Sequence, residues 1–247
     1  MANQNPRDST VSSFQAGYDT LRYVSPETSC PYLPDRLSRS EAYWVESLDG
    51  EMYARMLARG FRRSGRILYR PRCRGCSECR QLRVPVEGMI LSRSLQRVWR
   101  RNADVRVEVG EPVPTDEKYA VYSRYLDEQH DHTMSRTYDS FREFLYDSPM
   151  DTLEIRYLVG RRLMGIGLAD RVSDGLSSVY MYFDPEFARR SPGTFSILWE
   201  VRMCRKEGLP YYYLGFFVAG SRTMSYKSRF RPNQILVGVD RWVTLGV

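Results

Sequence analysis

The stretch Thr152–Phe183, TLEIRYLVGRRLMGIGLADRVSDGLSSVYMYF, decides the fold of this chain. It contains three runs rich in β-branched and aromatic residues, and such runs are typical of strands. A tight Gly160-Arg161-Arg162 turn follows the first run, and Asp174-Gly175 precedes the third. Connections this short join antiparallel neighbours. The stretch therefore predicts an antiparallel meander with strands at 152–159, 163–172 and 176–183.

A helix and a fourth strand are predicted after this meander. Residues 184–191 are expected to form a loop, and Pro192-Gly193-Thr194 to open a helix that runs to Glu207 before Gly208. The run Tyr211–Phe217 is unbroken and apolar, which predicts a central strand covered on both faces. The helix should bury Phe195, Leu198, Val201 and Met203.

Shorter elements are predicted upstream. A Pro-bounded turn after residue 109 marks the expected boundary between two lobes. We expect an α+β fold with a flexible arm at 1–27, a Cys/Arg-rich lobe at 28–104 and a second lobe with a mostly antiparallel sheet at 105–247. The predicted upstream elements are an edge strand and loop at 35–50, strands at 66–70, 82–86 and 105–109, and helices at 50–59, 92–101, 116–130 and 140–146.

Cysteines are concentrated in the first lobe. Cys73, Cys76 and Cys79 follow the spacing C-x-x-C-x-x-C inside GFRRSGRILYRPRCRGCSECRQL, residues 60–82. Thiolates at this spacing can converge on one metal ion or cluster, and Cys30 is a candidate fourth ligand. The spacing alone does not separate zinc, an iron–sulfur cluster or a metal-free Cys-rich loop.

Positive charge is concentrated in the same region. Residues 55–106 contain fifteen arginines and three acidic residues, whereas the whole chain has a net charge of +7. A local field of this strength attracts a polyanion such as RNA. The predicted helix at 92–101 contributes four arginines without an acidic partner, which favours phosphate contacts over an ordinary amphipathic surface helix. These candidate phosphate-binding residues are Arg93, Arg97, Arg100 and Arg101.

Composition argues against several other classes of protein. No apolar run approaches the ~20 residues of a membrane span. The first ten residues are polar, which is not typical of a signal peptide. The odd, clustered set of five cysteines favours a reduced protein over a disulfide scaffold. We therefore expect a cytoplasmic protein without a membrane partner.

The order of elements after residue 150 resembles the acyltransferase fold of the GNAT type. In that fold a Gly-rich turn at a helix N-terminus holds a pyrophosphate, which makes Gly193 and Thr194 candidate phosphate contacts. The acetyl-CoA pattern has a small residue where this chain has Phe195. A phosphate-bearing acyl donor other than coenzyme A is therefore expected.

An ordered set of motifs resembles one family over about residues 28–236. The chain is similar to the bacterial branch of the arginyl-tRNA–protein transferase family. Members of that branch move leucine from leucyl-tRNA to proteins beginning with Asp or Glu, which marks them for degradation, and the transfer requires no cofactor. The motifs are Cys30-Pro-Tyr-Leu-Pro, Gly60-Phe-Arg-Arg-Ser-Gly, Tyr69-Arg-Pro, the three cysteines, Ser92-Arg-Ser-Leu-Gln-Arg, Tyr180-x-Tyr-Phe-Asp-Pro, Gly193-Thr194, Tyr213-Leu-Gly and Met224-x-Tyr-Lys-x-x-Phe-x-Pro.

The resemblance implies two binding sites. The acceptor carboxylate needs a buried cation, because a charge left unpaired by a neutral acceptor is costly. The candidates are Lys227 and Arg231, followed by Arg62 and Arg63. The candidates for the aminoacyl and adenine pocket are Met181, Phe183, Tyr213 and Phe216.

The sequence does not decide which residues are catalytic. The donor is an activated ester, so holding amine and ester in line is the main requirement, and a general base is optional. Tyr226 and Lys227 are candidates, whereas His130 and His132 are interpreted as an exposed helix end. The competing hypotheses are a non-catalytic RNA-binding protein with a zinc-ribbon lobe and a GNAT protein acetyltransferase.

Overall fold

The computed structural model describes residues 22–129 and 135–245. Most of the arm expected at 1–27, together with His130 and His132, lies outside the described residues. The helices are α2 (Gly50–Leu57), α3 (Arg93–Arg101), α4 (Asp116–Gln129), α5 (Tyr138–Leu145) and α6 (Pro192–Lys206), with 3-10 helices η2 (Pro185–Arg190) and η3 (Ser225–Arg229). None of the helices in these ranges is long and apolar enough to cross a membrane.

Two small sheets form most of the part before residue 80. The first has four strands in the order β1-β4-β6-β5, and the second pairs β2 with β3. The prediction of an edge strand at 35–50 fits β3, which pairs only with β2, but not β4, which lies inside its sheet between β1 and β6. These strands are β1 (Arg22–Val24), β2 (Thr28–Ser29), β3 (Leu37–Ser38), β4 (Ser40–Trp44), β5 (Arg62–Ser64) and β6 (Ile67–Pro71).

The large sheet has eight strands in the order β14-β13-β7-β12-β11-β10-β9-β8. Its pairs are antiparallel, except that β12 runs parallel to β11. The predicted meander and central strand are confirmed, as is a mixed α+β fold with a mostly antiparallel sheet. The strands are β7 (Arg80–Pro85), β8 (Val105–Gly110), β9 (Thr152–Val159), β10 (Arg162–Val172), β11 (Gly175–Phe183), β12 (Tyr211–Phe217), β13 (Gln234–Gly238) and β14 (Arg241–Thr244).

Strand β7 comes from the first part of the chain but lies within the large sheet, among strands from the last part. This strand precedes the expected boundary at 104–105, yet it pairs with β12 on one side and β13 on the other. The large sheet thus contains strands from both expected lobes. The boundary itself stays a prediction.

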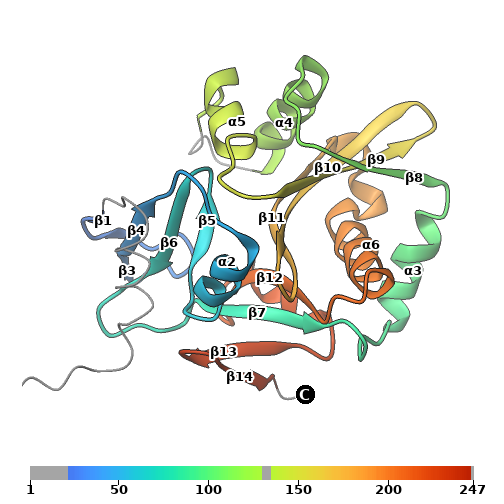
Figure 1. The fold of residues 1–247 in the computed structure, drawn as a ribbon. Helices are drawn as coiled ribbons and strands as arrows, with labels where there is room; N and C mark the ends of the chain where they lie inside the picture. Colours follow the sequence, from blue (N-terminus) through green and yellow to red (C-terminus); the bar gives the residue numbers. More distant parts are fainter. Residues whose placement is uncertain (1–21, 130–134, 246–247) are drawn as a thin grey trace, which may run out of the picture.

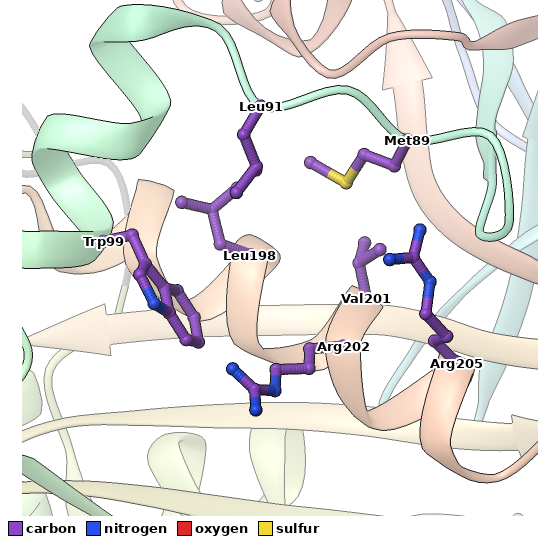
Figure 2. Close-up of a pocket in the computed structure, with 7 residues that line it drawn as sticks. All are labelled: Met89, Leu91, Trp99, Leu198, Val201, Arg202 and Arg205. Atoms are coloured by element: carbon purple, nitrogen blue, oxygen red, sulfur yellow. The ribbon is translucent and has the colours of Figure 1, made fainter.

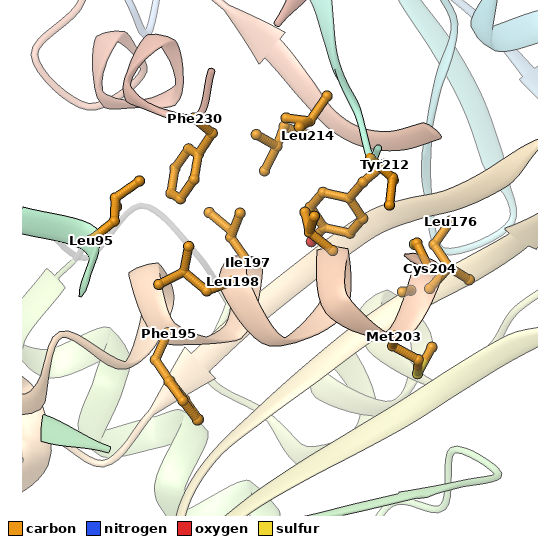
Figure 3. Packing of buried hydrophobic residues seen from close by; sticks show 14 of the residues in the cluster. Leu95, Leu176, Phe195, Ile197, Leu198, Met203, Cys204, Tyr212, Leu214 and Phe230 are labelled. Atoms are coloured by element: carbon orange, nitrogen blue, oxygen red, sulfur yellow. The ribbon is translucent and has the colours of Figure 1, made fainter. Parts of the chain in front are cut away.

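Helix α6 organises the largest core. Phe195, Leu198, Val201 and Met203 are all buried, as predicted from their helical spacing. Figure 3 shows α6 side chains packed against residues from β11, β12 and α3. Burying each large apolar side chain contributes roughly 1.5–3 kcal/mol, so this helix is firmly held on the sheet.

Helices lie on more than one side of the large sheet. Figure 1 shows α3 and α6 on the side away from α2 and the four-stranded sheet. Helix α2 packs in a separate core with residues of the four-stranded sheet, and α4 and α5 pack in a third core on β10 and β11. The predicted loop at 184–191 instead contains η2, which Asp184 caps by accepting a hydrogen bond from the backbone of Glu186.

Candidate active site

The site is built where the two parallel strands separate. Strand β11 pairs with β12 from Gly175 and Tyr211 to Ser177 and Tyr213, and the described residues show no further pairing between them. Strand β12 changes register against β7 between Tyr213 and Gly215 at the same level. The gap leaves peptide groups of both strands available to side chains from elsewhere in the chain.

Arg62, on β5, extends into this gap. Its Nη1 donates a hydrogen bond to Ser177 Oγ over 2.9 Å, and its Nη2 donates to the carbonyl of Ser178. Gly215 has a φ of 82°, and a Cβ there would lie 3.2 Å from the guanidinium of Arg62. A side chain at position 215 would therefore be strained and would collide with Arg62. Only 6% of Arg62 is exposed.

Lys227 approaches the same gap from η3. Its Nζ donates a hydrogen bond to the carbonyl of Phe216 over 2.7 Å, and the residue is 8% exposed. Burial, followed by the nearby charge of Arg62, lowers the pKa of Lys227 to about 7. A lysine in this setting is close to losing its proton at neutral pH.

Two aromatic residues close the site on the side of the Cys-rich loop. The rings of Tyr69 and Phe216 meet edge to face, with centroids 6.1 Å apart. Burial, followed by smaller contributions from Tyr69, Cys79 and Cys30, raises the pKa of Tyr32 to about 12, against the opposing charge of Arg62. Tyr32 and Tyr69 are therefore neutral hydrogen-bonding groups near Arg62.

The two cations have no carboxylate partner in the described part of the chain. Neither Arg62 nor Lys227 forms an ion pair there, and their polar contacts are with a hydroxyl and backbone carbonyls. Burying an unpaired charge costs several kcal/mol. A bound carboxylate would offset this cost, so the arrangement is suited to an anionic ligand.

The other two predicted acceptor cations lie in different settings. Arg63 donates through Nε and Nη2 to the two carboxylate oxygens of Asp170, each over 2.7 Å, and both residues are buried. The charge of Arg63 is therefore already paired with the carboxylate of Asp170. Arg231 is exposed, and its Nε donates to the carbonyl of Ser228 over 3.3 Å. The structure thus brings Arg62 and Lys227 together and leaves Arg63 and Arg231 apart from them.

The predicted pocket residues are divided between the two strands. Phe216 lies at the gap, whereas the buried Tyr213 donates its hydroxyl to Asp174 over 2.7 Å. Met181 and Phe183 are half-buried near the far end of β11, where Phe183 meets Tyr125 with centroids 5.1 Å apart.

Tyr226 adjoins Lys227 on η3 and is 39% exposed. Burial raises its pKa, so its hydroxyl keeps its proton and can donate a hydrogen bond. The electrostatic influence of Tyr226 reaches Tyr125, whose pKa is raised to about 12, mainly by burial.

The predicted phosphate contacts lie on the other side of the sheet. Arg93, Arg97, Arg100 and Arg101 are exposed on α3, which packs on α6 through Leu95 and Val98. Ser92 caps α3 by accepting from the backbone of Leu95. A Cβ added at Gly193, at the start of α6, would meet no atom within 4 Å, so space beside this helix N-terminus is open. Thr194 is half-buried beside it.

A hollow of about 260 Å³ lies between α3 and α6 (Figure 2). Apolar side chains form most of its lining, including Trp99 and Leu198. Arg202 and Arg205 border it, and the guanidinium of Arg202 lies 5.5 Å from the centre of the Trp99 ring. The hollow thus combines an aromatic surface with two positive charges.

The four cysteines are neighbours but do not form a metal-binding set in this structure. Cys73 Sγ contacts the backbone of Arg39, and Cys76 Sγ accepts from Arg36 Nη1 over 3.1 Å. Burial, followed by Cys30, Cys73 and Cys76, raises the pKa of Cys79 to about 12, which favours its thiol form. Within residues 22–129 and 135–245 no three His, Cys, Asp or Glu residues are placed to hold a metal ion.

Ser177 and Gly215 were not predicted as parts of the site. Gly215 carried a usable signal, because a glycine inside a buried strand marks a bulge or a close approach. Ser177 carried none, since its role depends on an arginine 115 residues away in the sequence.

Comparison with known proteins accounts for this arrangement. The model described as "Arginine-tRNA-protein transferase, N terminus" matches residues 28–97, and the one described as "Arginine-tRNA-protein transferase, C terminus" matches residues 117–237. The fold and these matches define an enzyme that uses an aminoacyl-tRNA as donor in acyl transfer. The chain belongs to the arginine-tRNA-protein transferase family.

Relatives with similar sequences carry more specific names. A protein of Hahella chejuensis named "Aspartate/glutamate leucyltransferase" is 39% identical over 90% of this chain and 96% of its own length. A protein of the same name from Nitrobacter winogradskyi is 40% identical over 87% of this chain and 88% of its own. Among solved structures, L-PGS from Bacillus licheniformis aligns with a TM-score of 0.46 and 9% identity over 57% of this chain and 45% of that chain.

Proposed function

We propose that this enzyme transfers leucine from leucyl-tRNA to the α-amine of proteins that begin with Asp or Glu. The observation that carries the proposal is the pair of buried cations, Arg62 and Lys227, without a carboxylate partner among the described residues. The side-chain carboxylate of the acceptor residue supplies the missing negative charge. A neutral acceptor leaves both cations buried and unpaired, which costs several kcal/mol.

The donor occupies the opposite side of the large sheet. Exposed arginines on α3 bind phosphates of the acceptor stem, and the N-terminus of α6 at Gly193 and Thr194 binds a phosphate near the tRNA 3′ end. The hollow beside Trp99 and Arg202 is suited to an unpaired base and its phosphate. The aminoacyl ester then reaches the gap between β11 and β12, which the acceptor enters from the other side. We propose a GNAT-like transfer site formed mainly by strands of the expected C-terminal lobe, with Arg62 contributed by the first lobe.

The reaction needs little proton transfer by the enzyme. The acceptor α-amine, with a free pKa of about 8, attacks the ester carbonyl in its neutral form. A bond forms between the amine nitrogen and the carbonyl carbon, the ester bond to the ribose oxygen breaks, and that oxygen takes the proton that the nitrogen loses. In this proposal Tyr226, whose hydroxyl keeps its proton because its pKa is raised, donates a hydrogen bond to the developing oxyanion or the leaving oxygen.

Lys227 acts chiefly through its charge. A carboxylate bound beside it stabilises the protonated form and raises its pKa again. The lysine is then a carboxylate-binding group in the acceptor complex, and its readiness to lose a proton applies to the free enzyme. We place the reaction in the cytoplasm, because it consumes charged tRNA.

The test is a transfer assay with purified protein. Leucyl-tRNA is mixed with peptides that differ only in their first residue, which is Glu, Asp, Gln or Ala, and leucylated peptide is measured by mass spectrometry. Arginyl-tRNA and acetyl-CoA serve as alternative donors. We expect leucine on the Glu and Asp peptides alone. Transfer from arginyl-tRNA or acetyl-CoA instead would overturn the proposed donor.

A further inference from the structure

A second open site lies beside the Cys-rich loop and has no assigned role. It is a groove of about 810 Å³ between residues 70–80 and the turn that joins β13 to β14. Pockets that hold ligands are typically ~300–1,000 Å³, so the groove is large enough for a short segment of polypeptide. Its lining includes five arginines and one acidic residue, namely Arg59, Arg70, Arg72, Arg74, Arg80 and Glu78.

The groove lies next to the site that holds Arg62 and Lys227. Arg80, in its wall, pairs with Phe217 in the sheet, and the neighbouring Phe216 provides the carbonyl that Lys227 contacts. Tyr69 pairs with Arg62 across β5 and β6, its ring contacts that of Phe216, and the next residue, Arg70, lines the groove. The groove is therefore within reach of a chain that leaves the gap past Tyr69.

Carboxylates outside the groove lining balance part of its positive charge. Arg70 and Arg72 both contact the buried carboxylate of Glu41, and Arg74 lies 3.6 Å from Glu27. Arg80 forms no ion pair among the described residues and is half-buried. The remaining excess of positive charge is moderate: Arg80 contributes to it, and so does the exposed Arg74, whose contact with Glu27 is long.

We propose that this groove holds the acceptor protein just after its first residue and favours acidic side chains there. The proposal rests on the proposed function, because it assumes that the acceptor N-terminus lies at Arg62 and Lys227. A polypeptide is favoured over RNA for two reasons. The α3 and α6 surface lies on the other side of the large sheet from β6 (Figure 1), and the partly balanced arginines match a few carboxylates better than a polyphosphate.

The experiment compares three peptides that all begin with Glu. Their positions three to five are neutral, acidic or basic, and kcat/KM is measured for each at saturating leucyl-tRNA. The wild-type enzyme should prefer the acidic peptide over the neutral one by about five-fold at low salt, the range that a few exposed ion pairs provide. The preference should shrink at high salt, because salt screens exposed charges.

Two double variants test whether Arg74 and Arg80 cause the preference for acidic peptides. The Arg74→Ala/Arg80→Ala double variant should bring the ratio of acidic to neutral peptide to about one. The Arg74→Glu/Arg80→Glu variant should reverse the preference toward the basic peptide, a gain that a merely unfolded protein cannot give. Arg93→Glu, on α3, is the matched control, and it should raise the KM for leucyl-tRNA while leaving the peptide preference in place.

The possible results distinguish a failure of the groove proposal from a failure of the proposed function. A wild-type enzyme that leucylates all three peptides equally well contradicts the groove proposal but leaves the proposed function intact. A rise in the KM for leucyl-tRNA in the Arg74→Ala/Arg80→Ala variant, without a change in peptide preference, assigns the groove to RNA instead. Absence of transfer to any Glu peptide contradicts the proposed function itself.

Discussion

Arg62 on β5 and Lys227 on η3 reach one gap between β11 and β12, and both are buried without a carboxylate partner in residues 22–129 and 135–245. Arg62 donates to Ser177 and Ser178, and Lys227 donates to the carbonyl of Phe216. Such an arrangement reduces stability unless a ligand completes it. We interpret this cost as part of the mechanism that selects acidic acceptors.

The lysine should therefore destabilise the free enzyme. Lys227→Met removes a buried charge and keeps a similar shape, so we expect a higher free energy of unfolding, by a few kcal/mol at pH 6.5. The folded-state pKa of Lys227, about 7, lies below its ordinary 10.5. Between these values the unfolded state binds more protons, so wild-type stability rises with pH and the advantage of the variant shrinks.

Urea unfolding at pH 6.5 and pH 9 measures this difference. Lys206→Met, at an exposed position of α6, is the control and should show no such pH dependence. An equal stability of Lys227→Met and wild type at both pH values would contradict the unpaired charge.

Glu200 should give the opposite dependence on pH. It is 2% exposed and accepts hydrogen bonds from Tyr157 and Tyr212, while burial raises its pKa from 4.5 to about 7. Between these values the folded state binds more protons, so wild-type stability falls as pH rises. Glu200→Gln should be more stable than wild type at pH 8, by on the order of a few kcal/mol, and nearly equal at pH 5.

Thermal unfolding followed by circular dichroism at both pH values tests this expectation. Glu117→Gln, in the exposed first turn of α4, is the matched control. A Glu200→Gln variant that loses stability equally at both pH values would mean that the carboxylate is needed in its charged form.

Arg63 should act in the structure rather than in acceptor selection. Asp170→Ala leaves its guanidinium buried and unpaired, and we expect a loss of about 3–5 kcal/mol in the free energy of unfolding. Replacing both partners, as Arg63→Met/Asp170→Leu, should recover most of that loss. This double variant should still discriminate between Glu and Gln peptides. Loss of that discrimination in a folded double variant would return Arg63 to the acceptor site.

The arginines of α3 should bind tRNA through phosphates. Arg97→Ala/Arg100→Ala should weaken tRNA binding and reduce the slope of log affinity against log salt by about one unit per lost contact. Filter binding at several salt concentrations measures both effects. Arg55→Ala, at an exposed position of α2, is the control. An unchanged slope in the α3 variant would exclude these two phosphate contacts.

Much of the fold was predictable because its signals are local. The meander at 152–183 and the apolar face of α6 follow from periodicity within a few residues, and both predictions were confirmed. The inner position of β4 and the placement of β7 between β12 and β13 were not foreseen, because strand pairing over long sequence distances leaves no local pattern. The candidate site shows the same limit.

Neighbouring arginines illustrate that limit. Arg62 and Arg63 were equal candidates in the sequence, yet alternation along β5 sends one to the gap and the other to Asp170. The partner of Arg63 lies 107 residues away in the sequence. Only the folded chain distinguishes a matched charge from an unmatched one.

The selectivity of the two buried cations provides the most direct test. Glu and Gln peptides compete for limiting leucyl-tRNA in the presence of wild type, Lys227→Met, Arg62→Met or Arg231→Ala. A buried charge pair of this kind corresponds to a selectivity of roughly 100-fold or more. We predict that wild type and Arg231→Ala keep this preference for Glu, and that Lys227→Met and Arg62→Met lose most of it while still binding leucyl-tRNA. Full preference for Glu in both Met variants would contradict the account.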